Sequence, residues 1–341
     1  MMKIFKYLSI AGMFLLVPSC GKNGADPKNP KSRDFELYID FWNTQGTNPQ
    51  ITFDAVNSSP EIKIDFSKTF AGIAVPPKFT NVIIDNVRII DDNDINYEID
   101  EITAYEWRED INDWKVDVEF TMNYSQVQDL LIMMVLDASA SLGTDFDKVQ
   151  TYAANFITKV LTEIPNARIG IIDFSDEIHS FPPTNNKTAL LNYIASVEQG
   201  PFTSLYEAVN MGIDFLENGD AEGKALLVFT DGTDNNSDPE FTPTYLLDRL
   251  DNSTATVGIN SFTIGLEGNG GVDKPVLEAL ASNSGDAAFP ENIDELGRVF
   301  EKFSSSIANV YNLTYVRNQQ VIPATDKARL RFVIKGTPKA E

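Results

Sequence analysis

The chain has 341 residues, with 50 acidic and 27 basic side chains, one His and one Cys, and 43% of its residues are hydrophobic. This length fits one large or two ordinary domains, and the hydrophobic fraction argues against wholesale disorder. A net charge of −23 repels phosphate backbones, which argues against nucleic-acid binding. One Cys excludes an intrachain disulfide and a Cys-based zinc site, and one His argues against His-rich metal chemistry.

The first 19 residues have the pattern of a targeting segment. Lys3 and Lys6 precede the apolar run 7–17, which is too short to cross a bilayer as a helix. The run leads into Pro18-Ser19-Cys20, which resembles a bacterial lipobox. This resemblance implies cleavage before Cys20 and attachment of lipid to it. The alternative is an ordinary secretory signal with an incidental Cys.

The part of the chain that follows favours β-structure. Residues 20–34 are polar and are predicted to form a flexible tether. Residues 35–128 contain short alternating or β-branched runs, separated by turns rich in Asn, Gly, Pro and Asp. Short strands without a helical period predict a sandwich-like β domain. The predicted strands are 35–42, 50–56, 61–66, 81–90, 101–107 and 114–124.

The pattern changes at residue 129. Residues 130–137 form a continuous apolar run ending in Asp, as expected of a strand buried on both faces. Further apolar runs at 168–174, 224–231, 256–265 and 287–289 alternate with helical patterns at 146–161, 187–197, 205–217, 243–251, 273–283 and 292–307. This alternation predicts an α/β domain over 129–308, with a doubly wound and mainly parallel sheet. Such a sheet binds its ligands beyond the carboxyl ends of its strands.

After residue 308 the sequence returns to a β pattern, with predicted strands at 309–316 and 327–335. About thirty residues cannot form a core of their own. We therefore expect residues 309–341 to complete the β domain of 35–128, with the α/β domain inserted into it. An edge hairpin packed on the α/β domain is the alternative.

Three loops of the α/β domain carry the candidate functional residues. The first predicted strand ends in Asp137-Ala138-Ser139-Ala140-Ser141, a later loop contains Thr203, and the third strand ends in Thr230-Asp231-Gly232. This set resembles a von Willebrand factor type A domain with a metal-ion-dependent adhesion site. The family pattern is D-x-S-x-S, then a Thr in a later loop, then an Asp after a buried strand. All five positions are present, in order, after the expected elements.

The resemblance implies a site for Mg²⁺, with Mn²⁺ as a substitute, since both ions suit hard oxygen ligands. The hydroxyls of Ser139, Ser141 and Thr203 can supply three oxygens. By resemblance, Asp137 and Asp231 act mainly through bound water. Few charged ligands leave the ion electrophilic, so its open position takes a carboxylate from a protein partner. The family binds in this way and cleaves no bond.

Other readings of the acidic residues in these loops are open. Acidic or hydroxyl side chains at strand ends often cap helices, and Thr144 or Asp145 has the right position to cap the first long helix. Asp234 and Asp238 lie beyond Asp231 and have the charge to attract a cation. We favour a solvated acidic loop for those two residues.

Three further motifs give weaker signals. The segment 92–96 begins like a calcium loop, but Tyr97 replaces the required Gly, so an EF-hand is rejected. The segment 219–225 misses the spacing of a phosphate-binding loop. His179 is expected in a short edge strand, where a surface or packing role is favoured over catalysis.

Together these features predict a lipid-anchored protein of a bacterial envelope, with the outer membrane favoured and the face of the membrane undecided. We expect its α/β domain to bind an acidic group of a protein partner through Mg²⁺. The alternative is a scaffold or assembly lipoprotein with a structural metal. A metal-assisted hydrolase is disfavoured, because the site offers no general base other than the carboxylates of the metal shell. We therefore predict that the protein is not an enzyme.

Overall fold

The computed structural model describes residues 33–42, 50–55, 62–65, 68–73, 80–91, 95–108, 110–116, 120–255, 257–267, 271–281, 285–317 and 327–339. The expected signal segment and Cys20 lie outside these residues, as do Asp92 and Asp94. None of the helices in the described ranges is long and apolar enough to span a membrane.

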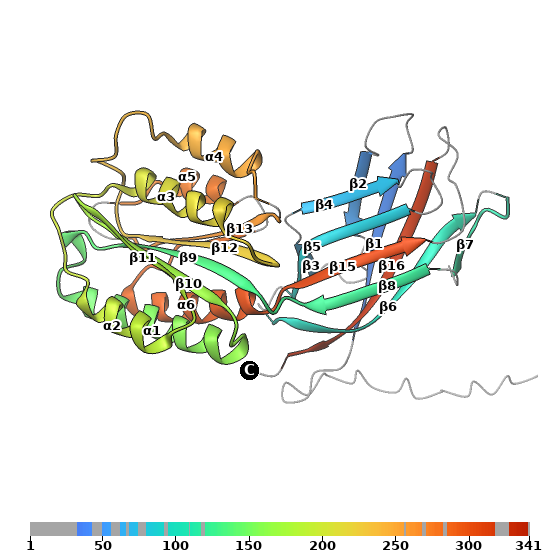
Figure 1. Ribbon diagram of the computed structural model, residues 1–341, viewed down its shortest axis with the longest axis horizontal. Helices are drawn as coiled ribbons and strands as arrows, with labels where there is room; N and C mark the ends of the chain where they lie inside the picture. The colour runs from blue at the N-terminus through green and yellow to red at the C-terminus, as the bar shows by residue number, and fades with distance from the viewer. Residues whose placement is uncertain are drawn as a thin grey trace, which may run out of the picture. The chain divides into compact units, whose positions relative to one another are not determined.

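A six-stranded sheet forms the centre of the α/β domain (Figure 1), with the strand order β11-β10-β9-β12-β13-β14. Neighbouring strands are parallel, except that β11 runs antiparallel to β10. This sheet confirms the predicted fold class. Its strands are β9 (Leu130–Asp137), β10 (Arg168–Phe174), β11 (Ile178–Thr184), β12 (Gly223–Thr230), β13 (Ile259–Gly265) and β14 (Asp286–Ala288).

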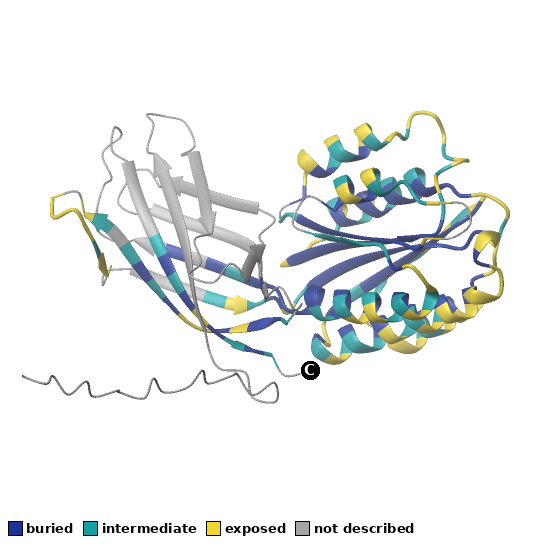
Figure 2. Ribbon diagram, turned by 180° about the vertical axis from the view of Figure 1, so that it is seen from behind, coloured by how far each residue is buried: buried dark blue, intermediate teal, exposed yellow. Residues whose placement is uncertain are grey.

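Helices cover both faces of this sheet (Figure 1). One face packs against α1 (Phe146–Glu163), α2 (Lys187–Ser196) and α6 (Ile293–Ala308). The other packs against α3 (Leu205–Asn218), α4 (Pro243–Asp251) and α5 (Lys274–Leu280). A short 3-10 helix, η1 (Ala140–Asp145), connects β9 to α1. Figure 2 shows the result, a buried sheet between helices whose outer surfaces are exposed.

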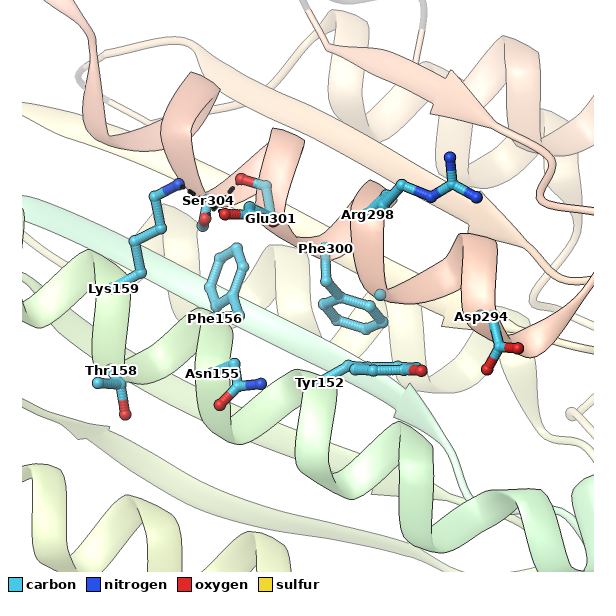
Figure 3. A pocket seen from close by; sticks show the side chains of 11 residues that line it. Tyr152, Asn155, Phe156, Thr158, Lys159, Asp294, Arg298, Phe300, Glu301 and Ser304 are labelled. Carbon is cyan, nitrogen blue, oxygen red and sulfur yellow. Dashed lines mark hydrogen bonds and ion pairs between the residues drawn. The ribbon is translucent and has the colours of Figure 1, made fainter. Parts of the chain in front are cut away.

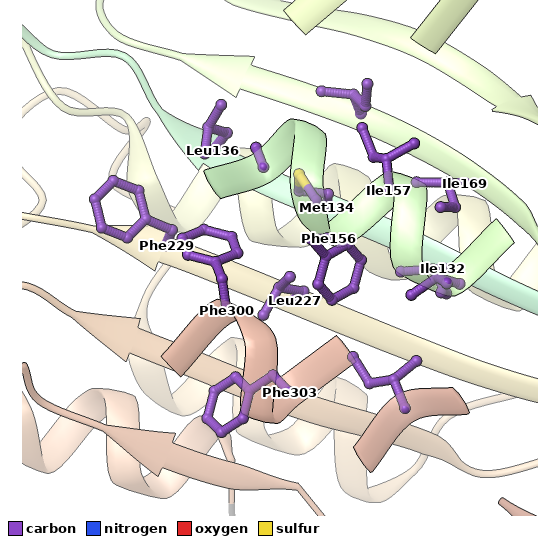
Figure 4. Packing of buried hydrophobic residues seen from close by; sticks show 14 of the residues in the cluster. Ile132, Met134, Leu136, Phe156, Ile157, Ile169, Leu227, Phe229, Phe300 and Phe303 are labelled. Atoms are coloured by element: carbon purple, nitrogen blue, oxygen red, sulfur yellow. The ribbon is translucent and has the colours of Figure 1, made fainter. Parts of the chain in front are cut away.

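The central strand β9 is buried along its whole length, because both of its faces meet helices. Its side chains alternate between two cores: Ile132 and Met134 face α1 and α6, whereas Met133 faces α3. Aromatic rings fill the first core (Figure 4). Phe300 lies 6.4 Å from Phe156 and 6.0 Å from Phe229 between ring centroids. Such burial, at ~25 cal/mol per Å² of apolar surface, is the main stabilisation of the domain.

Two further sheets lie outside the α/β domain. One has the order β2-β1-β16-β6-β7, and the other has the order β3-β5-β15-β8 with β4 paired to β5. Tyr315 and Phe332 connect the two sheets, with ring centroids 5.5 Å apart. The strands are β1 (Arg33–Trp42), β2 (Gln50–Ala55), β3 (Ile62–Asp65), β4 (Lys68–Ile73), β5 (Thr80–Asp91), β6 (Tyr97–Arg108), β7 (Asp113–Val116), β8 (Phe120–Gln126), β15 (Tyr311–Arg317) and β16 (Lys327–Pro338).

The last two strands pair with strands that precede the α/β domain. β15 lies between β5 and β8, and β16 lies between β1 and β6, all antiparallel. The backbone N–H of Val127 donates to the carbonyl of Val310 at 2.8 Å, so the chain enters and leaves the α/β domain side by side. This strand order supports our proposal that the α/β domain is inserted into a β domain.

Some elements differ from the sequence prediction. The single strand predicted over 114–124 is two strands, β7 and β8, in different sheets. β4 was not predicted, because its Ala71-Gly72 pair has low β propensity; its pairing with β5 places it in the sheet. β11 contains Pro182 and Pro183, which an edge strand tolerates because one side of it needs no ladder hydrogen bonds.

Candidate metal site

The three candidate loops meet at one edge of the six-stranded sheet. β9 and β12 are parallel neighbours, so Asp137, the last residue of β9, and Asp231, which directly follows β12, lie at strand ends that are side by side. The loop between α2 and α3 joins them through Gly200. The N–H of Gly200 donates to the carbonyl of Ala138 at 2.9 Å, and the N–H of Ala140 donates to the carbonyl of Gly200 at 2.8 Å. The structure therefore brings all five predicted residues to the same edge.

Three side-chain oxygens from two of these loops form a small triangle. The hydroxyls of Ser139 and Ser141 lie 2.8 Å apart. Both reach Asp231 Oδ1, with Ser141 donating at 2.8 Å and Ser139 at 3.3 Å. In an octahedral Mg²⁺ shell with bonds of ~2.1 Å, neighbouring oxygens lie roughly 3.0 Å apart. The spacing of the two hydroxyls therefore fits two neighbouring ligands of such a shell, and Asp231 Oδ1 lies beside them as the acceptor of both.

Thr203 contributes a third hydroxyl to this edge. Thr203 is only 5% exposed, and a Cβ at Gly232 would lie 3.7 Å from its hydroxyl oxygen, which therefore lies beside the loop that follows Asp231. Asn235 fixes its backbone: the N–H of Thr203 donates to Asn235 Oδ1 at 3.0 Å, and the N–H of Asn235 donates to the carbonyl of Thr203 at 3.0 Å. These contacts hold the hydroxyl of Thr203 at the same edge as Asp231.

Asp137 is fully buried and both of its carboxylate oxygens are occupied. Oδ1 accepts the backbone N–H of Ser139 at 2.8 Å, and Oδ2 accepts the hydroxyl of Thr230 at 2.6 Å. This geometry lets Asp137 orient Ser139. Sequence reasoning assigned no role to Thr230 or to Asn235. For Thr230 the available signal was its position between a buried strand and Asp231.

The two carboxylates at this edge are costly to ionise together. Burial raises the pKa of Asp137 to about 6, and the nearby charge of Asp231 adds to the rise, although hydrogen bonds from Thr230 and Ser139 oppose it. Burial also raises the pKa of Asp231, against hydrogen bonds from Ser141 and Ser139. A cation placed between these groups would favour the charged form of both.

Asp234 has a different role from the one expected. Its carboxylate accepts the backbone N–H of Tyr206 at 2.9 Å and the hydroxyl of Ser237 at 2.5 Å. The oxygen of Ser237 in turn accepts the N–H of Glu207 at 3.0 Å. These contacts satisfy the first amides of α3. The prediction of a solvated acidic loop is therefore wrong for Asp234, whereas Asp238 is exposed as expected.

The remaining candidates lie apart from the triangle. Asp145 precedes α1 but makes no side-chain capping hydrogen bond, so the capping alternative is not realised there. His179 is exposed on β11, with Nδ1 3.3 Å from Asp173 Oδ2. The hydroxyl of Tyr193 donates to the other oxygen of Asp173 at 2.6 Å. These contacts agree with the packing role expected for His179.

A separate cavity of about 470 Å³ lies between α1 and α6 (Figure 3). Tyr152 packs against Gly297, where an added Cβ would lie 2.8 Å from the ring, and the ion pair of Lys159 and Glu301, 3.7 Å apart, lies at the other end of the lining. None of the five predicted site residues lines this cavity.

A comparison with protein families matches residues 132–302 to the von Willebrand factor type A domain. The match covers half of the chain. The chain belongs to the von Willebrand factor type A family. A comparison of this type A protein with curated proteins found no match.

Several solved structures are similar to the type A domain. BatB from Bacteroides thetaiotaomicron is 17% identical, with a TM-score of 0.41, over 52% of this chain and 98% of that one. The vWF domain of the type V pili tip protein Mfa5 from Porphyromonas gingivalis is 14% identical, with a TM-score of 0.42. The match covers 54% of this chain and 96% of that one. Proximal thread matrix protein 1 from the mussel byssus, with a zinc-occupied MIDAS motif, is 16% identical, with a TM-score of 0.45. The match covers 59% of this chain and 50% of that one. The similarity thus spans half of the mussel protein's length.

Proposed function

We propose that this protein binds a partner protein through a divalent cation held at the loop edge of its type A domain. The observation that carries the proposal is the oxygen triangle of Ser139, Ser141 and Asp231, with edges of 2.8, 2.8 and 3.3 Å. The hydroxyl of Thr203 belongs to the same edge, beside Gly232. This donor set consists of hard oxygens, which suits Mg²⁺ best and Mn²⁺ as a substitute.

Each side chain has a distinct task in this proposal. The hydroxyls of Ser139, Ser141 and Thr203 hold the ion, Asp231 accepts hydrogen bonds from the two serines, and Asp137 orients Ser139 through its backbone N–H. When bound, the ion supplies a Lewis-acidic position for a carboxylate of the partner. We propose binding without catalysis, because the two carboxylates here are already committed to positioning the hydroxyls.

Titration calorimetry with Mg²⁺ and Mn²⁺ tests the metal site. Thr203→Ala and Ser139→Ala should each weaken metal binding by roughly 10–100-fold while leaving the fold intact. Thr233→Ala is the matched control, because Thr233 is exposed in the loop after β12. Equal metal affinity in the three variants and the wild type would show that these hydroxyls do not bind the ion.

Affinity capture from an envelope extract, in Mg²⁺ and then in EDTA, tests the binding role. A partner retained in Mg²⁺ and released by EDTA, without a loss of melting temperature, supports metal-mediated binding. A partner that stays bound in EDTA, combined with a lower melting temperature, would instead favour the scaffold with a structural metal.

We also propose that the protein is attached to a bacterial envelope membrane through lipid on Cys20, with the outer membrane favoured. The proposal rests on the lipobox-like sequence that ends at the only Cys of the chain. Cys20→Ser should leave the protein unprocessed or release it from the membrane fraction. A processed variant that remains in washed membranes would contradict lipid anchoring.

The inserted-domain proposal has its own test. A fragment of residues 125–310 should unfold cooperatively, because its sheet and both helical layers are complete. A fragment of residues 35–128 should not, because it lacks the strands β15 and β16 and exposes the edges that they cover. A cooperative melt of the second fragment would favour two sequential domains.

A further inference from the structure

The loops around the proposed metal site carry acidic side chains and no basic ones. Four segments form this edge: 137–145, 174–178, 198–207 and 230–242. Hydrogen bonds join the second to the third, where Ser204 donates to the carbonyl of Ser175 through both its N–H, at 3.0 Å, and its hydroxyl, at 2.8 Å. Within these segments the sequence has ten Asp or Glu residues and no Lys or Arg.

Part of this charge is not neutralised by the protein. Asp137, Asp231 and Asp234 are engaged in the hydrogen bonds described above. Glu198, Asp238 and Glu240 are different, because their side chains are exposed and form no ion pair with any described residue. Their field extends over about a Debye length of 8–10 Å. An approaching carboxylate is therefore repelled unless positive charge accompanies it.

An exposed aromatic side chain lies on the same loop as Thr203. Phe202 is 50% exposed and directly precedes Thr203. The described residues include only four exposed large hydrophobic side chains, the others being Ile111, Val116 and Tyr245. Aromatic side chains that become buried at the centre of an interface supply much of the binding energy there. Because Phe202 is exposed and adjoins a proposed ligand of the ion in the same loop, its ring is available to a partner that binds there.

We infer that the partner presents its carboxylate within a basic segment that also places an apolar side chain on Phe202. The basic side chains match Glu198, Asp238 and Glu240, and the apolar one covers the ring. This inference rests on the proposed function, because the carboxylate is held by the ion. It adds the chemistry that separates the partner from other acidic proteins: a Glu or Asp flanked by Lys or Arg, next to an aliphatic or aromatic residue.

Immobilised synthetic peptides of equal length test this chemistry with the full-length protein. The first three peptides have a central Glu. Its flanking residues are Lys and Leu in the first peptide, Lys and Ser in the second, and Asp and Leu in the third. A fourth copies the first with Gln at the centre. In Mg²⁺ the first peptide should retain the protein at least about tenfold more tightly than the third. EDTA should abolish retention of the protein on the first peptide, and the fourth peptide, with Gln at its centre, should not retain the protein.

Variants of the protein test the two surface features separately. Phe202→Ser should weaken binding of the first peptide about fivefold, to the level of the second, with Mg²⁺ affinity unchanged. Ile111→Ser is its control, since Ile111 is 48% exposed in the turn between β6 and β7. The double variant Glu198→Gln/Glu240→Gln should weaken binding about threefold at low salt and reduce its salt dependence. Asp220→Asn, ahead of β12 at the opposite edge, is its control.

The outcomes distinguish this inference from the function on which it rests. Retention that requires Mg²⁺ but is equal for the first and third peptides, or unaffected by Phe202→Ser, overturns the inference alone. The absence of Mg²⁺-dependent retention of every peptide overturns both. Retention that follows Lys over Asp flanks and falls in Phe202→Ser supports the inference.

Discussion

The hydroxyl of Thr230 donates a hydrogen bond of 2.6 Å to Asp137 Oδ2, across the ends of the parallel neighbours β9 and β12. Both side chains are fully buried, so water cannot replace this bond. The other oxygen of Asp137 accepts the N–H of Ser139 at 2.8 Å. The position of a proposed metal-binding hydroxyl therefore depends on a residue from a different strand.

Replacing Thr230 with Val should disturb the site without changing the shape of the core. Val has nearly the volume of Thr but leaves Asp137 Oδ2 without its donor. The pKa of Asp137 should then rise further above 6, since the lost bond lowers it. We expect a loss of about 1–3 kcal/mol in the free energy of unfolding and a roughly tenfold loss of Mg²⁺ affinity. Denaturation and calorimetry measure the two effects, with the exposed Thr233→Val as control. A variant that binds Mg²⁺ like the wild type would show that Thr230 does not position Asp137.

Asp137→Asn should stabilise the metal-free protein while abolishing metal binding. The folded protein raises the pKa of Asp137 from 3.8 to about 6, so it binds this proton more tightly than the unfolded chain does. Ionisation above pH 6 therefore costs the fold up to about 3 kcal/mol, from a shift of roughly two pKa units at 1.36 kcal/mol each.

Because the folded protein binds the proton of Asp137 more tightly than the unfolded chain does, its free energy of unfolding depends on pH. In EDTA, the wild type should gain stability as the pH falls from about 7 towards 4, and Asp137→Asn should lack that part of the gain. Urea denaturation at pH 7.5 and pH 4.5 measures the difference, with Glu198→Gln as an exposed control. Equal unfolding free energies of wild type and Asp137→Asn at pH 7.5 would contradict a buried, charged Asp137.

Gly200→Ala should displace the loop that carries Thr203. A Cβ at position 200 would lie 2.2 Å from Ser175 Oγ and 2.7 Å from Ser175 Cβ, so the loop or β10 must shift. We expect a loss of about 1–3 kcal/mol in the free energy of unfolding. Mg²⁺ binding should also weaken, because the backbone of Gly200 forms hydrogen bonds with Ala138 and Ala140, the two residues that flank Ser139. The double variant with Ser175→Gly should recover part of the loss. If Gly200→Ala alone melts and binds Mg²⁺ like the wild type, the close approach is not required.

Asp234→Ala should lower stability more than it lowers metal affinity. The carboxylate of Asp234 accepts the N–H of Tyr206 in the first turn of α3, and loss of such a cap costs about 0.5–2 kcal/mol. Asp234→Asn keeps an acceptor and should retain most of this stability. Thermal denaturation of both variants, together with Mg²⁺ titration, separates the roles. A loss of Mg²⁺ affinity as large as that of Thr203→Ala would place Asp234 in the metal site instead.

The sequence alone determined the α/β class and the order of its elements. The apolar runs that become β9, β10 and β12 have no polar alternation, because these strands are buried on both faces. A parallel sheet also fixes which strand ends lie together, so the strand-terminal positions of Asp137 and Asp231 were enough to predict that they share one edge, whereas Thr203 was assigned to it by resemblance to the type A family. These features depend on local patterns, which a single sequence displays.

Only the tertiary structure decided which partner each polar group takes. Asp234 has the same residue type as Asp231 and lies three positions away, yet it caps α3 while Asp231 accepts the hydroxyls of Ser139 and Ser141. Likewise, Thr230 and Asn235 act through residues 93 and 32 positions away. Hydrogen bonds over such separations arise when strands and loops pack together, and no periodicity in the sequence records them. The sequence indicated that residues 309–341 complete the β domain, but the particular neighbours of β15 and β16 depend on how distant strands pack together.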